Sequence, residues 1–277
     1  MYKMGKSERY TRIRAINEFG YDINWDDLRK KTVAIIGVGG LGVVSSEMVT
    51  RCGIGKLLLF DFDKVETLNL NRSMFKPEHI GKPKVKIAAK ILNEINPDVE
   101  INYFINDIMD MDFEHTFERE LSQTDIVLNG LDNLPAREYL NNKCVKLEVP
   151  YIDAGASRSG LSGYIHPIIP FKTACAKCIK SIPLNLPEER GEPCVASLPS
   201  TMAILASIQV QEMLKYLLKF GKMLDYLMYH MITGDFLQYK TIRDKNCPIC
   251  GIQKKKAENI KPKTSDKDIK DMIEKLD

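Results

Sequence analysis

A glycine-rich turn is the first feature of this chain whose residue types and spacing could do chemistry. Gly37, Gly39 and Gly42 directly follow the apolar run 33–36, and a second apolar run ends in Asp61. Glycines at this spacing let backbone N–H groups approach a phosphate, and the positive end of the following helix favours the same anion. A carboxylate at the end of the second strand can accept hydrogen bonds from ribose hydroxyls. The pattern predicts a nucleotide site and by itself favours a dinucleotide such as NAD or FAD, with glycines kept only for close packing as the alternative.

Two pairs of cysteines with the spacing Cys-x-x-Cys form the second candidate set. They are Cys175 with Cys178, and Cys247 with Cys250. Two thiolates at this spacing fit adjacent corners of a tetrahedron, so two pairs complete the four-coordinate shell of a structural Zn²⁺. A redox role for one pair would not explain the presence of the second pair. We expect the metal to clamp the loop around the first pair against the C-terminal hairpin.

The other three cysteines differ in their surroundings. Cys52 and Cys144 lie in helical patterns beside apolar neighbours, which is typical of inert core residues. Cys194 instead lies in an aperiodic loop, a few residues before a predicted helix. A thiol near a helix N-terminus has a lowered pKa, and the thiolate is the nucleophilic form. Because no histidine lies near Cys194 in the sequence, position alone leaves its nucleophilic role open.

The elements that must position these residues alternate between strand and helix. Apolar runs bounded by turn residues predict strands over 32–36, 56–60, 99–104, 125–129 and 150–154. Helical spacing predicts helices over 7–20, 40–52, 82–95, 133–147 and 200–220, the last ending at Gly221. An apolar run over 161–169 continues the sheet, and a hairpin over 224–232 and 235–242 turns at Thr233-Gly234. Such alternation implies an α/β fold whose mostly parallel sheet is covered on both faces.

Composition limits the classes of function. The chain has 277 residues and a formal net charge of +3, which does not indicate binding to nucleic acid or to a charged membrane surface. It has no N-terminal signal segment and no apolar run of about 18 residues, so we expect a cytoplasmic protein without a membrane span. Its seven cysteines, without a secretion signal, favour metal binding or catalysis over a disulfide framework.

Longer motifs connect these features to a known family. Residues 50–66 read TRCGIGKLLLFDFDKVE, and residues 194–202 read CVASLPSTM. On these motifs, and over about residues 8–251, the chain resembles the ThiF/MoeB superfamily of ubiquitin-like-protein-activating enzymes. Both segments are similar to the branch that activates the ubiquitin-fold modifier. The final Cys-Pro-Ile-Cys-Gly251 is closer to the bacterial molybdopterin-synthase adenylyltransferase.

The resemblance implies a reaction and an architecture. It implies that ATP and Mg²⁺ are used to adenylate the C-terminal glycine of a small β-grasp protein, and that Cys194 then takes the acyl group as a thioester. It further implies a Rossmann-like, doubly wound adenylation domain over 1–250, with C-terminal antiparallel strands and a crossover loop over 170–200 that carries Cys194. We expect residues 251–277 to form a flexible tail with a short amphipathic helix.

The resemblance also implies roles for individual residues. Gly40 faces the phosphates, Asp61 binds the ribose, and Asp132 binds Mg²⁺ beside Asn133, which contacts the nucleotide. The polar groups around the triphosphate are Asn69, Arg72 and Lys84, of which Arg72 and Lys84 are expected to stabilise developing negative charge. Arg12 matches an arginine that reaches the nucleotide of a partner subunit, which implies a homodimer. Without the family, Arg72 and Lys84 would be interpreted as surface charges, Asp132 and Asn133 as a helix cap, and Arg12 as an exposed helix residue.

Three other functions remain open at this point. The first keeps the adenylation but passes the acyl-adenylate to a sulfur donor, with Cys194 dispensable for the first step. The second is a nicotinamide or flavin oxidoreductase, although no hydride-relay group is evident. The third is a catalytically silent scaffold subunit, for which the set of Asp132, Lys84, Arg72 and Cys194 would have no chemical purpose. The leading hypothesis is activation of a ubiquitin-like protein that is passed on to a conjugating enzyme.

Overall fold

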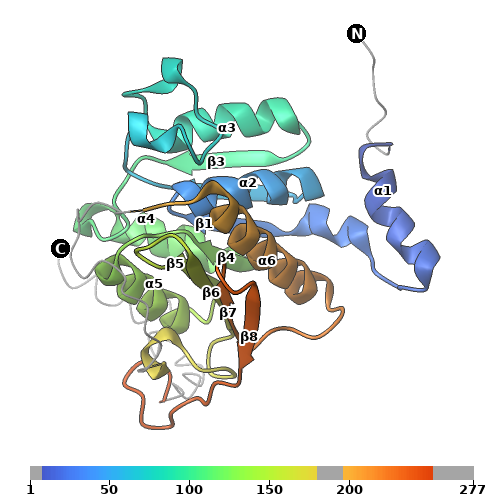
Figure 1. Cartoon of the computed structure of the whole chain (residues 1–277), viewed down its shortest axis with the longest axis vertical. Coiled ribbons are helices and arrows are strands. Elements are labelled where there is room, and N and C mark those ends of the chain that lie inside the picture. The colour runs from blue at the N-terminus through green and yellow to red at the C-terminus, as the bar shows by residue number, and fades with distance from the viewer. Residues whose placement is uncertain (1–7, 180–195, 252–277) are drawn as a thin grey trace, which may run out of the picture.

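Residues 8–179 and 196–251, which this computed structural model describes, build one sheet with helices on both faces (Figure 1). The strands are β1 (Thr32–Ile36), β2 (Lys56–Phe60), β3 (Glu100–Phe104), β4 (Ile126–Asn129), β5 (Tyr151–Ala156), β6 (Ser162–Ile168), β7 (Tyr226–His230) and β8 (Asp235–Tyr239). The helices are α1 (Thr11–Arg14), α2 (Gly40–Cys52), α3 (Lys84–Ile95), α4 (Met111–Ser122), α5 (Leu134–Lys146) and α6 (Pro199–Leu218).

The order of the strands is β3-β2-β1-β4-β5-β6-β7-β8. The first five strands in this order are parallel, and the last three pair antiparallel. The predicted fold class, a doubly wound and mostly parallel sheet with C-terminal antiparallel strands, is therefore confirmed. Because the chain leaves β1 toward β2 on one side and returns to β4 on the other, β1 and β4 form the topological switch point. Ligands of such sheets bind outside the carboxyl ends of the strands at this point.

The core lies in two layers, one on each face of the sheet. Val33 and Ile35 of β1 pack in the layer that contains α2, α3 and α6. Ala34 and Ile36, which point to the other face, pack in the layer of α4 and α5. All four side chains are buried, which explains why a strand covered on both faces appears in the sequence as an unbroken apolar run. Among the described helices, none combines the length and the apolar character needed to cross a bilayer.

Two predicted helices need correction, and one helix was missed. Helix α4 was not predicted, although Asp110 caps it and Phe113, Phe117 and Leu121 follow at helical spacing. Its apolar face is narrow, and many charges surround it. The last predicted helix ends at Leu218 rather than at residue 220, because Lys219 adopts the left-handed conformation with φ of 56°.

The N-terminal helix predicted over 7–20 is broken into short turns. A 3-10 turn over Glu8–Tyr10, the single turn α1 and a 3-10 turn over Ala15–Phe19 replace it. Of these described residues only Tyr10 is buried, so the apolar spacing that predicted one helix does not correspond to a continuous buried face. The predicted tail helix lies outside the described residues.

The glycines at the switch point are in direct backbone contact. A Cβ atom at Gly42 would lie 1.9 Å from the carbonyl oxygen of Gly37, and one at Gly130 would lie 2.6 Å from the same oxygen. Gly37 also has a φ of 86°, which side chains other than glycine rarely adopt. Close packing therefore requires Gly37, Gly42 and Gly130, whereas a Cβ at Gly39 would meet open space.

The contrast between Gly42 and Gly39 gives a test of this packing. We expect Gly42→Ala to lower the free energy of unfolding by about 3 kcal/mol, because backbone atoms at the switch point must separate. Gly39→Ala is the matched control and should change it by no more than about 0.5 kcal/mol. Urea unfolding followed by circular dichroism measures both values. Equal midpoints for the two variants would contradict the packing argument.

Candidate functional site

The predicted nucleotide site lies where three strands end at the same edge of the sheet. The glycine turn follows β1, Asp61 follows β2, and Asp132 follows β4 by three residues. Helix α2 begins at Gly40, so its first turn and its free N–H groups face this edge. The topology thus brings together residues that lie far apart in the sequence.

Asp61 joins the glycine turn to the loop after β2. Its Oδ2 accepts a hydrogen bond of 2.6 Å from the Val38 N–H, and its Oδ1 accepts one of 2.8 Å from the Asp63 N–H. Burial raises the pKa of Asp61 to about 6, although the nearby Lys84 and the two N–H groups oppose this shift. The carboxylate is therefore held in place beside the glycine turn and ionises near neutral pH.

Lys84 brings a positive charge among several carboxylates. It is the first residue of α3, is 8% exposed, and its Nζ lies 2.7 Å from Oδ2 of Asp63. Burial alone would lower the pKa of Lys84, but the charges of Asp61, Asp63 and Asp132 raise it above its ordinary value. Lys84 therefore stays protonated beside the predicted magnesium ligand. Sequence reasoning missed Asp63, whose position two residues after Asp61 was the available signal.

Arg72 lies against the first turn of α2. A Cβ atom at Gly40 would lie 3.0 Å from Cδ of Arg72, so the glycine leaves room for this side chain. The guanidinium donates hydrogen bonds of 2.7 Å to the Leu68 carbonyl and 3.1 Å to Oδ1 of Asn71. Asn69 stabilises the same turn, because its Oδ1 accepts a bond of 2.8 Å from the Glu66 N–H.

Asn133 has a structural role beside the exposed Asp132. Its Oδ1 accepts a hydrogen bond of 3.0 Å from the Ala136 N–H, so it caps α5. This is the role that the sequence predicts when the family resemblance is left aside. Its Nδ2 donates a bond of 3.3 Å to Oδ1 of Asp132. The same cap thus places the carboxylate of Asp132 at the carboxyl edge of the sheet.

Two predicted residues do not join this cluster. The exposed Arg12 follows Tyr10, whose hydroxyl accepts a 2.8 Å bond from Asn96, just after the C-terminus of α3. This places Arg12 near the edge of the sheet opposite to Gly40, and Figure 1 shows α1 set apart from the sheet. Cys194 lies outside the described residues.

Cys52 is partly buried and Cys144 fully buried, and burial raises the pKa of both thiols, as expected for inert cysteines.

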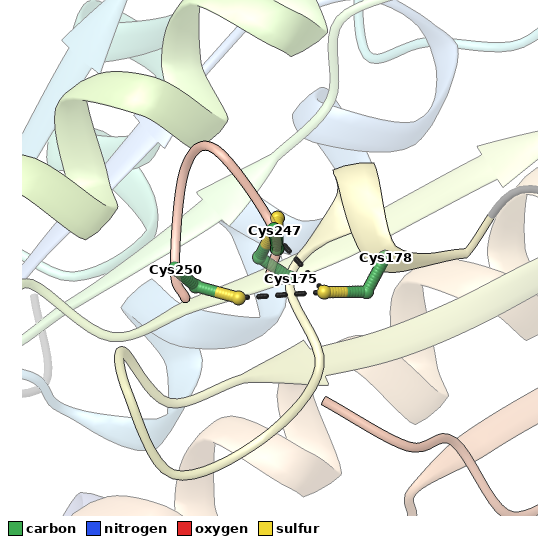
Figure 2. Close-up of side chains that lie close together, drawn as sticks. All are labelled: Cys175, Cys178, Cys247 and Cys250. Atoms are coloured by element: carbon green, nitrogen blue, oxygen red, sulfur yellow. Dashed lines mark hydrogen bonds between the residues drawn. The ribbon is translucent and has the colours of Figure 1, made fainter. Parts of the chain in front are cut away.

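The four paired cysteines come together as predicted. Figure 2 shows the sulfur atoms of Cys175, Cys178, Cys247 and Cys250 in one cluster, and all lie within 4.8 Å of one another. The S···S distances are 3.9 Å for Cys175–Cys178, 3.7 Å for Cys175–Cys247 and 3.3 Å for Cys178–Cys250. Tetrahedral Zn²⁺ with Zn–S bonds of about 2.3 Å requires separations of about 3.8 Å. Both the donor set and the spacing fit a structural zinc ion.

Neighbouring groups favour the thiolate of Cys247, whereas burial raises the pKa of Cys175 and Cys250. Burial raises the pKa of Cys247, but the N–H groups of Cys250 and Ile249 outweigh this effect and bring it to about 7. Arg243 donates bonds of 3.1 Å to the Cys250 carbonyl and 2.9 Å to the Phe171 carbonyl. The guanidinium therefore ties the second cysteine turn to the segment that precedes the first.

A polar cavity was not predicted from the sequence. Its volume is about 400 Å³, and it lies between α5, the strands β5 to β7 and the cysteine turns. Its lining residues are Leu134, Arg137, Glu138, Asn141, Asn142, Asp153, Tyr164, His166, Ala176, Lys177, Ile179, Tyr226 and Ile249. The polar residues among them come from distant parts of the chain, and the available signal was His166 inside an otherwise apolar strand.

Several polar groups at this cavity are buried without complete hydrogen bonding. Nε of Arg137, Nε2 of His166 and the hydroxyl of Tyr226 have no hydrogen-bond partner among the described residues. Burial lowers the pKa of His166 to about 4, so its imidazole is neutral at physiological pH. Because unpartnered buried polar atoms are costly, these three atoms are an energetic cost to the fold in the wall of the cavity.

Comparison with known proteins adds relatives that share most of this sequence. The model of the ThiF family matches residues 10–258. Ubiquitin-like modifier-activating enzyme 5 from Gallus gallus is 42% identical over 272 residues, which cover 93% of this chain and 68% of the relative. The enzyme of the same name from Aedes aegypti is 42% identical over 243 residues, which cover 83% of this chain and 61% of the relative. This chain therefore spans only about two thirds of the length of these relatives.

Solved structures of Escherichia coli MccB share the fold. The structure with AMPCPP and selenomethionine MccA has a TM-score of 0.77 and 22% identity, and the alignment covers 90% of this chain and 76% of that one. The structure with ATP has a TM-score of 0.70 and 24% identity, with coverage of 82% and 68%. At this level of identity the likeness shows the architecture alone.

Metal analysis tests the cysteine cluster. We expect the purified protein to contain about one Zn²⁺ per chain, and Cys178→Ser to lose it and to unfold at a lower temperature, because the site closes a long loop. Cys52→Ala is the control and should keep the metal. Elemental analysis and thermal unfolding measure both effects. A wild-type protein that is folded and free of zinc would contradict the assignment.

The raised pKa of Asp61 predicts a pH dependence of nucleotide affinity. If Asp61 binds the ribose as the sequence predicts, its ionised carboxylate accepts hydrogen bonds from the hydroxyls, and protonation at about pH 6 removes this interaction as the pH falls. Relative to Asp61→Asn, whose side chain at this position does not titrate, we expect the affinity of the wild type for Mg·ATP to fall about tenfold between pH 7 and pH 5. Calorimetry at several pH values measures the difference, and parallel curves for the two proteins would rule out this role.

Proposed function

Because this chain belongs to the ThiF family, we propose that it uses Mg·ATP to activate the C-terminal glycine of a ubiquitin-like protein. The name shared by relatives 42% identical to this chain, ubiquitin-like modifier-activating enzyme 5, supports this substrate class. In the proposed first step, the glycine carboxylate attacks the α-phosphorus of ATP. The bond to the bridging oxygen breaks, pyrophosphate leaves, and an acyl-adenylate forms.

The observation that carries the proposal is the convergence of charge at the carboxyl edge of the sheet. Arg72 lies against Gly40, and Lys84 lies in the field of Asp61 and Asp132. A phosphoryl-centre displacement needs fixed positive charge where negative charge develops, together with a carboxylate for Mg²⁺. A redox cofactor would not require this set, and the family disfavours an oxidoreductase.

Each residue of the cluster has a proposed role. The N–H groups near Gly40 and the cations of Arg72 and Lys84 bind the phosphates and stabilise the leaving pyrophosphate. Asp61 binds the ribose and Asp132 binds Mg²⁺. Asn69 and Asn133 shape the turns around the nucleotide, as their hydrogen bonds to the backbone indicate.

The polar cavity suits the terminal residues of the protein substrate. Leu134, one of its lining residues, is two positions after Asp132, so the cavity begins beside the proposed magnesium site. An extended peptide presents both N–H and C=O groups, and the polar side chains of Glu138, Asn141 and Asn142 are among those that line the cavity. We propose that the peptide bonds to these side chains as it approaches the α-phosphate.

In the proposed second step, the Cys194 thiolate attacks the acyl-adenylate, AMP leaves, and a thioester forms for transfer to a conjugating enzyme. Arg12 lies too far from Gly40 in its own chain to serve that site, which supports a homodimer in which each Arg12 reaches the partner's nucleotide. The four-cysteine cluster has no open ligand position, so its zinc is structural. The proposed setting is the cytoplasm. In the second candidate function, the enzyme adenylates a sulfur-carrier protein and a sulfur donor then attacks the adenylate, so Cys194 is not needed.

Pyrophosphate exchange and a gel assay test the proposal together. A panel of β-grasp proteins with an exposed C-terminal glycine, starting with the ubiquitin-fold modifier, is incubated with enzyme and Mg·ATP. We expect one of them to stimulate exchange of pyrophosphate into ATP, and Arg72→Ala to lower this rate about 10³-fold. Without thiol reductant, the wild type should give a conjugate that reductant removes, whereas Cys194→Ser should keep the exchange and lose the conjugate.

The outcomes separate the alternatives. Exchange without a reductant-sensitive conjugate would favour the sulfur-carrier adenylyltransferase. Absence of exchange with every protein in the panel would favour the silent scaffold. Urea unfolding of each variant shows whether a lost activity reflects lost structure.

A further inference from the structure

The loop that carries Asp132 is held on both sides by buried polar side chains. The N–H of Leu131 donates a hydrogen bond of 2.9 Å to Oδ1 of Asn129, which is 1% exposed. The carbonyl of Leu131 accepts a hydrogen bond from Nη2 of Arg137, which is 6% exposed. Both bonds fix the peptide groups directly before Asp132, so the position of its Cα follows from them.

Arg137 is in turn anchored to the neighbouring strands. Its Nη1 donates bonds of 2.7 Å to Oδ1 of Asp153 and 2.8 Å to the hydroxyl of Tyr164. Its Nη2 also donates a bond of 2.8 Å to the Ala154 carbonyl. A Cβ atom at Gly155 would lie 2.9 Å from Nη2, so glycine there leaves room for the guanidinium.

Both supports of the loop meet at one carboxylate. Oδ1 of Asp153 accepts the bond from Arg137 and also a bond of 2.6 Å from Nδ2 of Asn129. The amide and the guanidinium are therefore parts of a single buried network, and neither can shift without changing its geometry. Shared hydrogen bonds of this kind couple the positions of the groups that make them.

Asp132 itself is weakly restrained. Its side chain is exposed and accepts a bond of 3.3 Å from Asn133. Mg²⁺ requires near-ideal octahedral geometry with bonds of about 2.0–2.1 Å, so a small displacement of its carboxylate ligand weakens binding. The precision that Mg²⁺ needs must therefore come from the backbone that Arg137 and Asn129 hold.

We propose that Arg137 is a positioning residue for the magnesium ligand, acting through the Leu131 carbonyl. The inference rests on the proposed function, because it assumes that Asp132 binds Mg²⁺ with ATP. A guanidinium is required here because it reaches two carbonyls, a carboxylate and a hydroxyl at once, which a lysine ammonium does not match. Arg137 also lines the polar cavity, so contact with the protein substrate is the competing role.

The test compares Arg137→Lys with the exposed control Arg51→Lys, which lies on α2. Binding of Mn²⁺ in the presence of ATP is measured by electron paramagnetic resonance, and the half-saturating Mg²⁺ concentration is measured by pyrophosphate exchange. We expect Arg137→Lys to weaken metal binding about tenfold in both assays, because loss of the residues that orient a metal ligand has an effect of this size. The KM for the protein substrate at saturating Mg²⁺ should stay unchanged. Arg51→Lys should match the wild type.

A double-mutant cycle gives the sharper readout. Asp132→Asn removes the carboxylate that Arg137 is proposed to position. Adding Arg137→Lys to this variant should weaken metal binding no further, because the two residues act as a unit. If urea titrations show that Arg137→Lys is not folded, Tyr164→Phe replaces this variant in the assays. Tyr164→Phe removes one hydrogen-bond partner of the guanidinium and should weaken metal binding by a smaller factor.

Four results would overturn the inference. Unchanged metal affinity in a folded Arg137→Lys protein removes the positioning role. Unchanged metal affinity with a raised KM for the protein substrate assigns Arg137 to substrate binding instead. Additive losses in the double mutant would show that Arg137 does not act through Asp132. A wild type that binds no Mn·ATP at all would overturn the proposed function first, and this inference with it.

Discussion

The close contact of backbone at the switch point is the constraint on which the site depends. Gly42 and Gly130 both approach the carbonyl of Gly37 so closely that a Cβ atom on either residue would overlap it. This contact brings the start of α2 and the loop after β4 to one edge of the sheet. The N–H groups proposed to bind phosphate and the predicted magnesium ligand can therefore serve one bound molecule, which separate sheet edges would not allow.

Charge compensation is the second constraint on this edge. Lys84 is buried at the start of α3, where neither burial nor a helix N-terminus favours a cation. Asp61, Asp63 and Asp132 outweigh both effects and keep it protonated. A site that balances one lysine with several carboxylates suits a ligand that brings both phosphates and a divalent cation. The acidic residues are therefore compatible with the proposed phosphate site, because they balance the charge of Lys84 and can bind the cation.

The sequence predicted what local periodicity and spacing determine. The bounds of β1, α2 and β2 coincide with their predictions, because a glycine or a charged residue flanks each of these elements on both sides. The two cysteine pairs were found from spacing alone, since tetrahedral zinc imposes that spacing. The N-terminal helix was wrong because its apolar residues do not face the core, and α4 was missed because charges mask its narrow apolar face. The polar cavity and the network around Arg137 depend on strand order, which no local pattern contains.

The chain on either side of the segment with Cys194 is fixed to the layers that form the site. Before it, the cysteine turn at Cys178 is joined to the C-terminal turn. After it, Gln209 of α6 accepts a bond of 2.7 Å from Ser45 of α2 and donates one of 2.9 Å to the Asn129 carbonyl. Gln209 thus ties α6 both to α2 and to β4, the strand that leads to Asp132. The described chain on both sides of Cys194 is therefore held by side-chain contacts to other elements of the fold, and α6, which follows Cys194, is tied directly to the strand that leads to Asp132.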